Sequence, residues 1–188
     1  NAASTSTVHI TEFTADLIKH GKLKLDPSRN DHIKATFHDS CNPARAMGIL
    51  EEPRFIMRNV CNNFYEMPEN TIREQTFCCG GGAGLGTDEN MEMRLRGGLP
   101  RGNAVRYVHD KFGVNQLACM CAIDRATLIT VCDYWAPEVQ VTGISELVAN
   151  ALVYKGGKPR EVDFRLEPRP EWEGSRQQAE KEEDGNEG

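Results

Sequence analysis

Hydrophobic positions along the chain repeat first with a helical period and then with a strand period, and this exchange continues to residue 154. Ile10, Phe13, Leu17 and Ile18 fall on one helical face over 10–20, and Gly21 can end that helix in the left-handed conformation. We expect further helices at 53–60, 88–96, 100–112, 122–134 and 145–154. We expect strands at 33–37, 63–67, 76–78, 114–118 and 139–141. Such alternation is typical of an α/β fold with a mainly parallel sheet and flanking helices.

Local start signals support four of these helices. Pro53 suits the first turn of a helix, and Pro100 can open the helix over 100–112. The side chains of Asp88 and Ser145 can accept hydrogen bonds from the free amides at the start of the helices that follow them.

Composition divides the chain into a body and a tail. We expect one domain over 1–156, with a helical lead-in at 1–26, and an extended, disordered acidic tail over 157–188. Residues 171–188 hold seven acids and two bases, and so carry most of the net charge of −6. The first residue, Asn1, is not methionine, which favours a piece of a longer protein.

Charge and hydropathy exclude several classes of function. The body is nearly neutral and has no basic face of the kind that nucleic-acid binding needs. No apolar run approaches the roughly 20 residues that a membrane span requires, and no secretory signal is visible. We therefore expect no nucleic-acid partner and no direct membrane span in this chain.

Two adjacent cysteines, Cys78 and Cys79, lead directly into the glycines Gly80, Gly81 and Gly82. A disulfide between neighbouring cysteines strains the peptide that joins them. Glycine reaches positive φ without steric cost, so a sharp turn can aim both thiolates at one inorganic centre and leave room for a bulky group. The pair therefore predicts a metal cluster, in which Gly80 and Gly81 line the cofactor.

The other cysteines also follow expected strands. Cys41 comes after the strand at 33–37, and Cys119 and Cys121 come after the strand at 114–118. Loops at the carboxyl ends of parallel strands meet at one edge of a sheet. Thiolates in this number suit an iron–sulfur cluster, with zinc as a second choice. Cys61 and Cys132 are interpreted as core residues.

The cysteine groups and their spacing resemble a known pattern. Cys41, Cys-Cys-Gly at 78–80 and Cys119-Met120-Cys121 are similar to the cysteine-rich CCG domain of heterodisulfide-reductase-type proteins, over roughly 34–156. The resemblance implies a non-cubane 4Fe-4S cluster that reduces a disulfide-like substrate. Its ligands here would be Cys41, Cys78, Cys79 and Cys121.

Within this family, the segments 42–45, 96–104 and 121–126 resemble the K subunit of the membrane-bound Dsr complex of sulfur-metabolising prokaryotes. This implies a cytoplasmic subunit, peripheral on the inner face of the membrane, with a membrane subunit among its partners and the small protein DsrC, as a trisulfide, as substrate. It also implies cubane 4Fe-4S clusters on an amino-terminal part. No Cys-x-x-Cys-x-x-Cys run exists here, so this chain would be the carboxyl-terminal catalytic portion.

The chain departs from the family's final Cys-x-x-Cys. In one alignment Cys121 is the first member, Asp124 replaces the second and Cys119 is an extra thiol. In the other alignment both Cys119 and Cys121 are ligands. A carboxylate is a harder donor than a thiolate and would bind iron more weakly.

Proton donors and rival functions complete the expectations. His38, Asp39 and Asp124 lie close to the cysteines in sequence and are candidate proton donors. The rivals are a CCG subunit of another redox enzyme, such as heterodisulfide reductase or a lactate or glycolate oxidase, and a non-catalytic zinc or electron-relay module. A docking patch or a solvated face is expected for the arginines at positions 94, 96, 101 and 106.

Overall fold

Three short parallel strands form the sheet in the computed structural model, which describes residues 7–82, 84–154 and 156. The strands are β1 (Ala35–Phe37), β2 (Gln116–Cys119) and β3 (Gln140–Gly143), in the order β1-β2-β3. Thr36 pairs with Leu117 in β2, and Leu117 pairs in turn with Val141 in β3. The expected α/β fold with a parallel sheet is confirmed.

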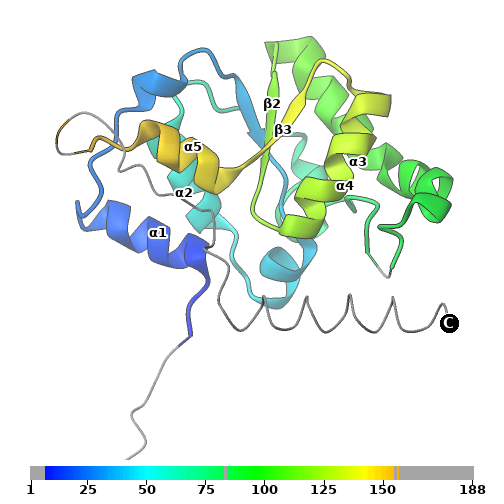
Figure 1. Ribbon diagram of the computed structural model, residues 1–188, viewed down its shortest axis with the longest axis horizontal. Coiled ribbons are helices and arrows are strands. Elements are labelled where there is room, and N and C mark those ends of the chain that lie inside the picture. The colour runs from blue at the N-terminus through cyan, green and yellow to red at the C-terminus, as the bar shows by residue number, and fades with distance from the viewer. Residues whose placement is uncertain (1–6, 83, 155, 157–188) are drawn as a thin grey trace, which may run out of the picture. The chain divides into compact units, whose positions relative to one another are not determined.

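Five α-helices cover the two faces of this sheet, with α1, α2 and α5 on one side and α3 and α4 on the other (Figure 1). Their bounds are α1 Ile10–Lys19, α2 Glu51–Val60, α3 Met91–Phe112, α4 Ala122–Trp135 and α5 Ile144–Ala151. Short helical turns join them at η1 Pro27–Asn30, η2 Asn42–Ala46, η3 Glu69–Thr71, η4 Arg73–Gln75 and η5 Asp88–Asn90. Of these η2 is a π-turn, and the others are 3₁₀ turns.

The sheet separates two apolar clusters, because successive side chains of a strand point to opposite faces. Phe37 and Ala118 pack with the buried faces of α2 and α5. Leu117 and Cys119 pack with α3 and α4 on the other face. The side chain of Cys119 therefore points toward the layer formed by α3 and α4.

Two expected strands are wrong. The segment 63–67 makes only a single bridge, between Phe64 and Ala35, before it turns away from the sheet. The segment 76–78 follows a 3₁₀ turn, and the hydroxyl of Thr76 donates to the carbonyl of Asp39 at 2.8 Å. Side-chain contacts replace a strand ladder at this place.

The helices expected at 88–96 and 100–112 form one continuous helix, α3, with Pro100 inside it. A proline in a helix interior costs about 3 kcal/mol. We attribute the continuity to packing, because α3 buries one face against the sheet and α4, and such burial outweighs local preference. Asp88 begins a 3₁₀ turn and does not cap α3.

Other expected boundaries moved by a few residues. Gly21 has φ of +63°, as expected after α1. The last helix begins at Ile144 with Gly143 as its N-cap, where Ser145 was the expected cap, and it ends at Ala151. The expected acidic tail at 157–188 lies outside the described residues.

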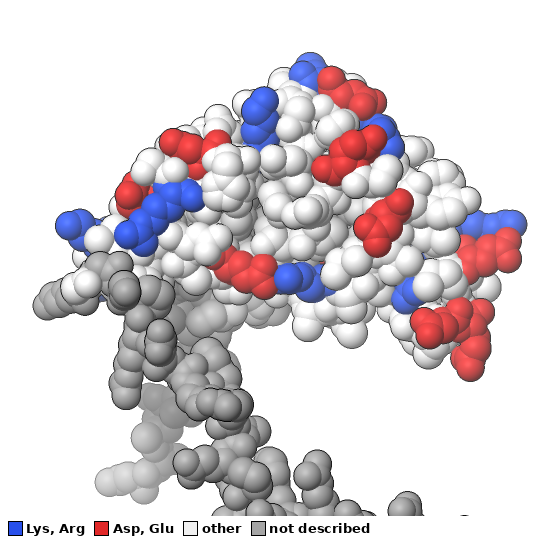
Figure 2. Space-filling model, turned by 45° about the horizontal axis from the view of Figure 1, so that its top comes forward, with Lys and Arg blue, Asp and Glu red and all other residues white. Residues whose placement is uncertain are grey.

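Acidic and basic side chains are interspersed on the face seen in Figure 2. The arginines expected to form one patch separate into two classes: Arg94 and Arg101 are buried, while Arg96 and Arg106 pair with Glu92 and Glu138. A docking patch or solvated face is therefore wrong for Arg94 and Arg101. In the part of the chain that the structure describes, no helix is long and apolar enough to cross a membrane.

Close packing of α3 on α4 depends on glycine. A methyl group at Gly102 would lie 2.5 Å from Cβ of Trp135, whereas one at Gly97 would meet nothing nearer than the Cα of Gly80 at 3.9 Å. We expect Gly102→Ala to lower the free energy of unfolding by about 1–3 kcal/mol through overpacking. Gly97→Ala, the matched control in the same helix, should raise it by about 0.5–1 kcal/mol.

Urea unfolding followed by circular dichroism measures both variants. Equal midpoints for Gly102→Ala and Gly97→Ala would contradict the close approach of the two helices.

Candidate functional site

The carboxyl end of β1 continues directly into a buried polar segment. The amide of His38 donates to the carbonyl of Ala118 at 2.8 Å, which extends the pairing of β1 with β2 by one residue. His38, Asp39 and Ser40 are each about 1% exposed. Cys41 follows with an exposed side chain at the start of the π-turn η2.

The carboxyl end of β2 supplies the second group. Cys119 is the last residue of the strand, and Cys121 is the N-cap of α4. Asp124 lies in the first turn of α4 and is 3% exposed. A pocket of about 220 Å³ is lined by residues that include Cys119, Cys121 and Arg125.

The vicinal cysteines reach this edge by a route that the sequence did not predict. Both carboxylate oxygens of Asp39 accept hydrogen bonds from the guanidinium of Arg54, at 2.7 and 2.8 Å. One of them also accepts from the amide of Arg73 at 2.7 Å. Asp39 therefore ties the segment that precedes Cys78 and Cys79 to the end of β1.

Two more arginines hold the same segment. Arg45 donates to the carbonyls of Glu74 and Thr76, and Arg101 donates to the hydroxyl of Thr76 at 2.8 Å. Sequence reasoning missed these positioning residues and Arg54. The available signal was a charged residue on an apolar helical face, because Arg54 shares its face with the buried Met57 in α2.

The glycines after the cysteines fit closely against the two helices. Gly80 has φ of +88°, and a Cβ there would lie 2.5 Å from the carbonyl oxygen of Arg94. A Cβ at Gly81 would lie 2.2 Å from Cγ2 of Thr127, while one at Gly82 would meet nothing within 4 Å. The space beside Gly80 and Gly81 is therefore filled by the protein, and the expectation that these two glycines leave room for a cofactor is wrong for this arrangement.

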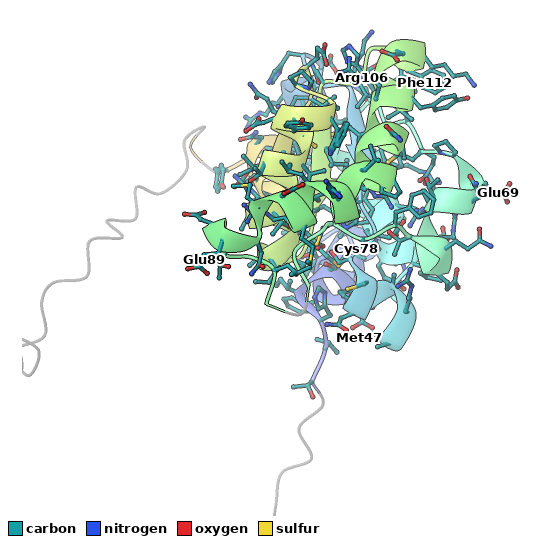
Figure 3. All side chains as sticks on the ribbon, turned by 90° about the vertical axis from the view of Figure 1, so that its right-hand side faces the viewer. Met47, Glu69, Cys78, Glu89, Arg106 and Phe112 are labelled. Carbon is teal, nitrogen blue, oxygen red and sulfur yellow. The ribbon has the colours of Figure 1, made fainter. Side chains whose placement is uncertain are left out.

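The two neighbouring thiols have different environments. Cys78 is exposed, and Cys79 is buried against α3 and α4. Figure 3 shows Cys78 at the lower centre of the folded body, with Met47 below it. The amides of Gly80 and Gly81 point at the sulfurs of Cys78 and Cys79, at 3.3 and 3.4 Å. Amide donors favour the thiolate form of a cysteine.

Asp124 joins the three cysteine groups. Its Oδ2 lies 3.5 Å from Nε2 of His38, and its carboxylate also lies beside the side chains of Ser40 and Cys79. Burial would raise the pKa of Asp124, but the contacts with His38, Ser40 and Cys79 hold it below its ordinary value. Burial lowers the pKa of His38, so the imidazole is neutral at pH 7.

Comparisons with known proteins agree with this arrangement of cysteines. The chain is 53% identical over 165 residues to the Hdr-like menaquinol oxidoreductase iron-sulfur subunit of Archaeoglobus profundus, over 87% of this chain and 30% of that protein. It is 52% identical to the Hdr-like menaquinol oxidoreductase iron-sulfur subunit 2 of Archaeoglobus fulgidus, over 86% of this chain and 30% of that protein.

A further relative belongs to the dihydromethanophenazine:CoB–CoM heterodisulfide reductase of Methanosarcina mazei, as one of the subunits of that enzyme. It is 31% identical over 151 residues, which is 77% of this chain and 34% of that protein. The chain is heterodisulfide-reductase-like. It spans about a third of the length of these relatives. No family model and no solved structure matches it.

The donor atoms of this heterodisulfide-reductase-like chain suit an iron–sulfur centre by their chemistry, because thiolates are the usual ligands of such clusters. Among the described residues, no three His, Cys, Asp or Glu side chains converge closely enough to hold a single metal ion. Buried polar atoms without hydrogen-bond partners remain at the same edge, on Nδ1 of His38, Oγ of Ser40 and Oδ2 of Asp124. The donor chemistry and these unpaired atoms fit the group.

Burial keeps several cysteines as thiols at neutral pH. It raises the pKa of Cys79 and Cys119 to about 12. A bound metal removes such a proton, because the cation stabilises the thiolate far more than water does. Cys61 and Cys132 are buried in the apolar clusters on opposite faces of the sheet, in agreement with their interpretation as core residues.

Asp39 is a candidate proton donor whose two oxygens are already occupied. Asp39→Asn would leave Arg54 buried with less compensating charge, and we expect the free energy of unfolding to fall by about 3–5 kcal/mol. The matched control is Glu92→Gln, which removes an acid from an ion pair that is 79% exposed on both sides.

Urea denaturation of both variants tests this role. The control should unfold at the wild-type midpoint, because exposed pairs contribute little to stability. An Asp39→Asn protein as stable as the wild type would show that the pair does not anchor the segment.

Proposed function

We propose that the chain is the part of a heterodisulfide-reductase-like iron–sulfur subunit that exchanges electrons with a disulfide or trisulfide substrate. The observation that carries the proposal is the position of Asp124. It contacts His38 after β1 and Cys79 in the glycine turn, and it lies three residues after Cys121 at the start of α4. Side chains from three distant cysteine groups thus approach one edge of the sheet.

The ligands that we propose are Cys41, Cys78, Cys79 and Cys121, with Cys119 or Asp124 as a fifth. Cys41 and Cys78 are exposed, and Cys121 is partly exposed, so three sulfurs are accessible to an incoming cluster. The names of the relatives, which are iron-sulfur subunits, support this group. The resemblance to the CCG domain favours the non-cubane 4Fe-4S form.

The reaction requires two electrons and two protons for each disulfide, and it yields two thiols. When bound, an iron–sulfur cluster supplies electrons one at a time. Nε2 of His38 faces Oδ2 of Asp124 at 3.5 Å, so this pair can hold and pass a proton at the edge of the site. We assign Asp39 a positioning role, because Arg54 and the amide of Arg73 occupy its oxygens.

The pocket beside Cys119 and Cys121 supports access for the substrate. Ile10 and Ile144 give it an apolar wall, and Arg125 adds a cation that pairs with Glu146. A DsrC-like small protein, as a trisulfide, is the specific candidate implied by the sequence. The Methanosarcina relative, whose name includes the CoB–CoM heterodisulfide, favours a small disulfide as the second candidate.

We also propose the cellular setting. The names of two relatives include menaquinol and dihydromethanophenazine, which supports a reduced, quinol-type donor whose electrons reach this chain through another subunit. Such donors reside in membranes. The chain would therefore be peripheral on the cytoplasmic face, held by a membrane subunit.

Substitution of single cysteines tests the proposal. We expect Cys79→Ser, after anaerobic reconstitution, to lose most of its iron and acid-labile sulfide, because the proposed ligand is removed. Cys132→Ala is the matched control, since Cys132 is an equally buried thiol in the same apolar cluster, and it should keep wild-type amounts.

Addition of a thiol or trisulfide substrate should then change the electron paramagnetic resonance signal of the wild type. Equal iron and sulfide in Cys79→Ser and in the wild type would contradict the ligand assignment. A signal that no sulfur substrate alters would contradict catalysis at this site and favour an electron relay.

A further inference from the structure

Arg101 is fully buried, at 0% exposure, in the middle of α3. It lies on the inner face of the helix, three residues after Gly98 and four before Val105, both of which are buried. A Cβ at Gly98 would lie 3.4 Å from the carbonyl oxygen of Cys79, so this face of α3 rests directly on the vicinal cysteines. The guanidinium therefore enters the protein one turn away from the candidate site.

The contacts of Arg101 are neutral. Its two Nη atoms donate to the carbonyl of Thr71 at 2.6 Å, to the hydroxyl of Thr76 at 2.8 Å and to the sulfur of Met67 at 2.8 Å. Its Nε has no partner. Among the described residues, no carboxylate lies within ion-pair distance of Arg101, in contrast to Arg54, which binds Asp39 and Glu66.

The charge of Arg101 acts on the candidate site. Burial lowers its pKa to about 10, against the opposing influence of acids and thiols that include Asp124 and Cys79. The side chain therefore remains a cation at neutral pH. In turn, its charge contributes to the lowered pKa of His38.

A buried cation without an ionised partner is unfavourable, and proteins usually place a compensating charge nearby. Asp39 already serves Arg54, and Asp124 faces His38. An iron–sulfur cluster held by four or more thiolates is an anionic group, and nearby charge is one of the factors that set its reduction potential. The site beside Cys79 would supply the anion that Arg101 lacks.

We propose that Arg101 is the buried counter-charge of the iron–sulfur centre and that it raises the reduction potential of that centre. This inference rests on the proposed function. Reduction adds negative charge, and a fixed cation in a medium of low dielectric constant stabilises the reduced form more than the oxidised form. Arg101 is thus a positioning residue for charge, and it touches neither substrate nor cluster.

A redox titration of the reconstituted chain, followed by electron paramagnetic resonance, tests the inference. Arg101→Gln removes the charge and keeps an amide that can donate to Thr71. We expect the ratio of reduced to oxidised centre at a fixed potential to fall about tenfold, which is a shift of about 59 mV for a one-electron couple. Arg101→Lys keeps the charge and should titrate close to the wild type.

Arg96→Gln is the matched control, because it removes one positive charge from the same helix at a side chain that is 79% exposed. Solvent screens such a charge, so the potential should stay at the wild-type value. Arg101→Met, which has a similar length, carries the same expectation as Arg101→Gln if the glutamine variant does not fold. If neither neutral variant folds, Arg101→Lys decides: a wild-type potential supports the counter-charge, and a tenfold fall overturns it.

Iron and acid-labile sulfide are measured in each preparation, so the two levels of the account can be separated. A wild type without iron and sulfide would overturn the proposed function and the inference together. Full iron and sulfide in every variant, with the same potential for Arg101→Gln, Arg96→Gln and wild type, would overturn the role of Arg101 alone.

Discussion

The buried ion pair between Asp39 and Arg54 is the interaction on which the candidate site depends. Asp39 follows the first strand, Arg54 lies on the helix that covers the sheet, and the same carboxylate accepts from the amide of Arg73. This contact holds the segment before Cys78 and Cys79 against the end of β1. Because a broken buried pair leaves a desolvated charge, the sequence has little freedom at either position.

Glycine then sets how closely the turn with the vicinal cysteines approaches the helices. Gly80 and Gly81 lie where any side chain would collide with Arg94 or Thr127, so the backbone of the turn rests on α3 and α4. Cys79 is thereby buried beside Asp124, while Cys78 remains exposed. One thiol of the pair faces the protein interior and the other faces solvent, which is an asymmetry suited to a centre bound at the protein surface.

The sequence predicted the parts of this fold that follow from periodicity. The sheet at Ala35–Phe37, Gln116–Cys119 and Gln140–Gly143 and the helices on its two faces follow from apolar spacing. The expected strands at 63–67 and 76–78 were wrong, because hydrogen bonds from side chains such as Thr76 hold those segments in place of a ladder. Pattern alone does not reveal such contacts between distant residues.

The candidate site was predictable in its cysteines and less so in its charges. The strand-end positions of Cys41 and Cys119 follow from topology, whereas Arg54 and Arg101 were visible only as charges on apolar helical faces. The partners of a buried charge depend on tertiary packing, which the sequence pattern does not specify.

The central claim is that these cysteines hold an iron–sulfur centre. Anaerobic purification and reconstitution of the chain, with iron, zinc and acid-labile sulfide measured in the same sample, tests it most directly. The account predicts iron and sulfide in near-equal amounts, with broad visible absorption and a paramagnetic signal in one oxidation state. Zinc without sulfide, or a colourless protein without metal, would contradict it.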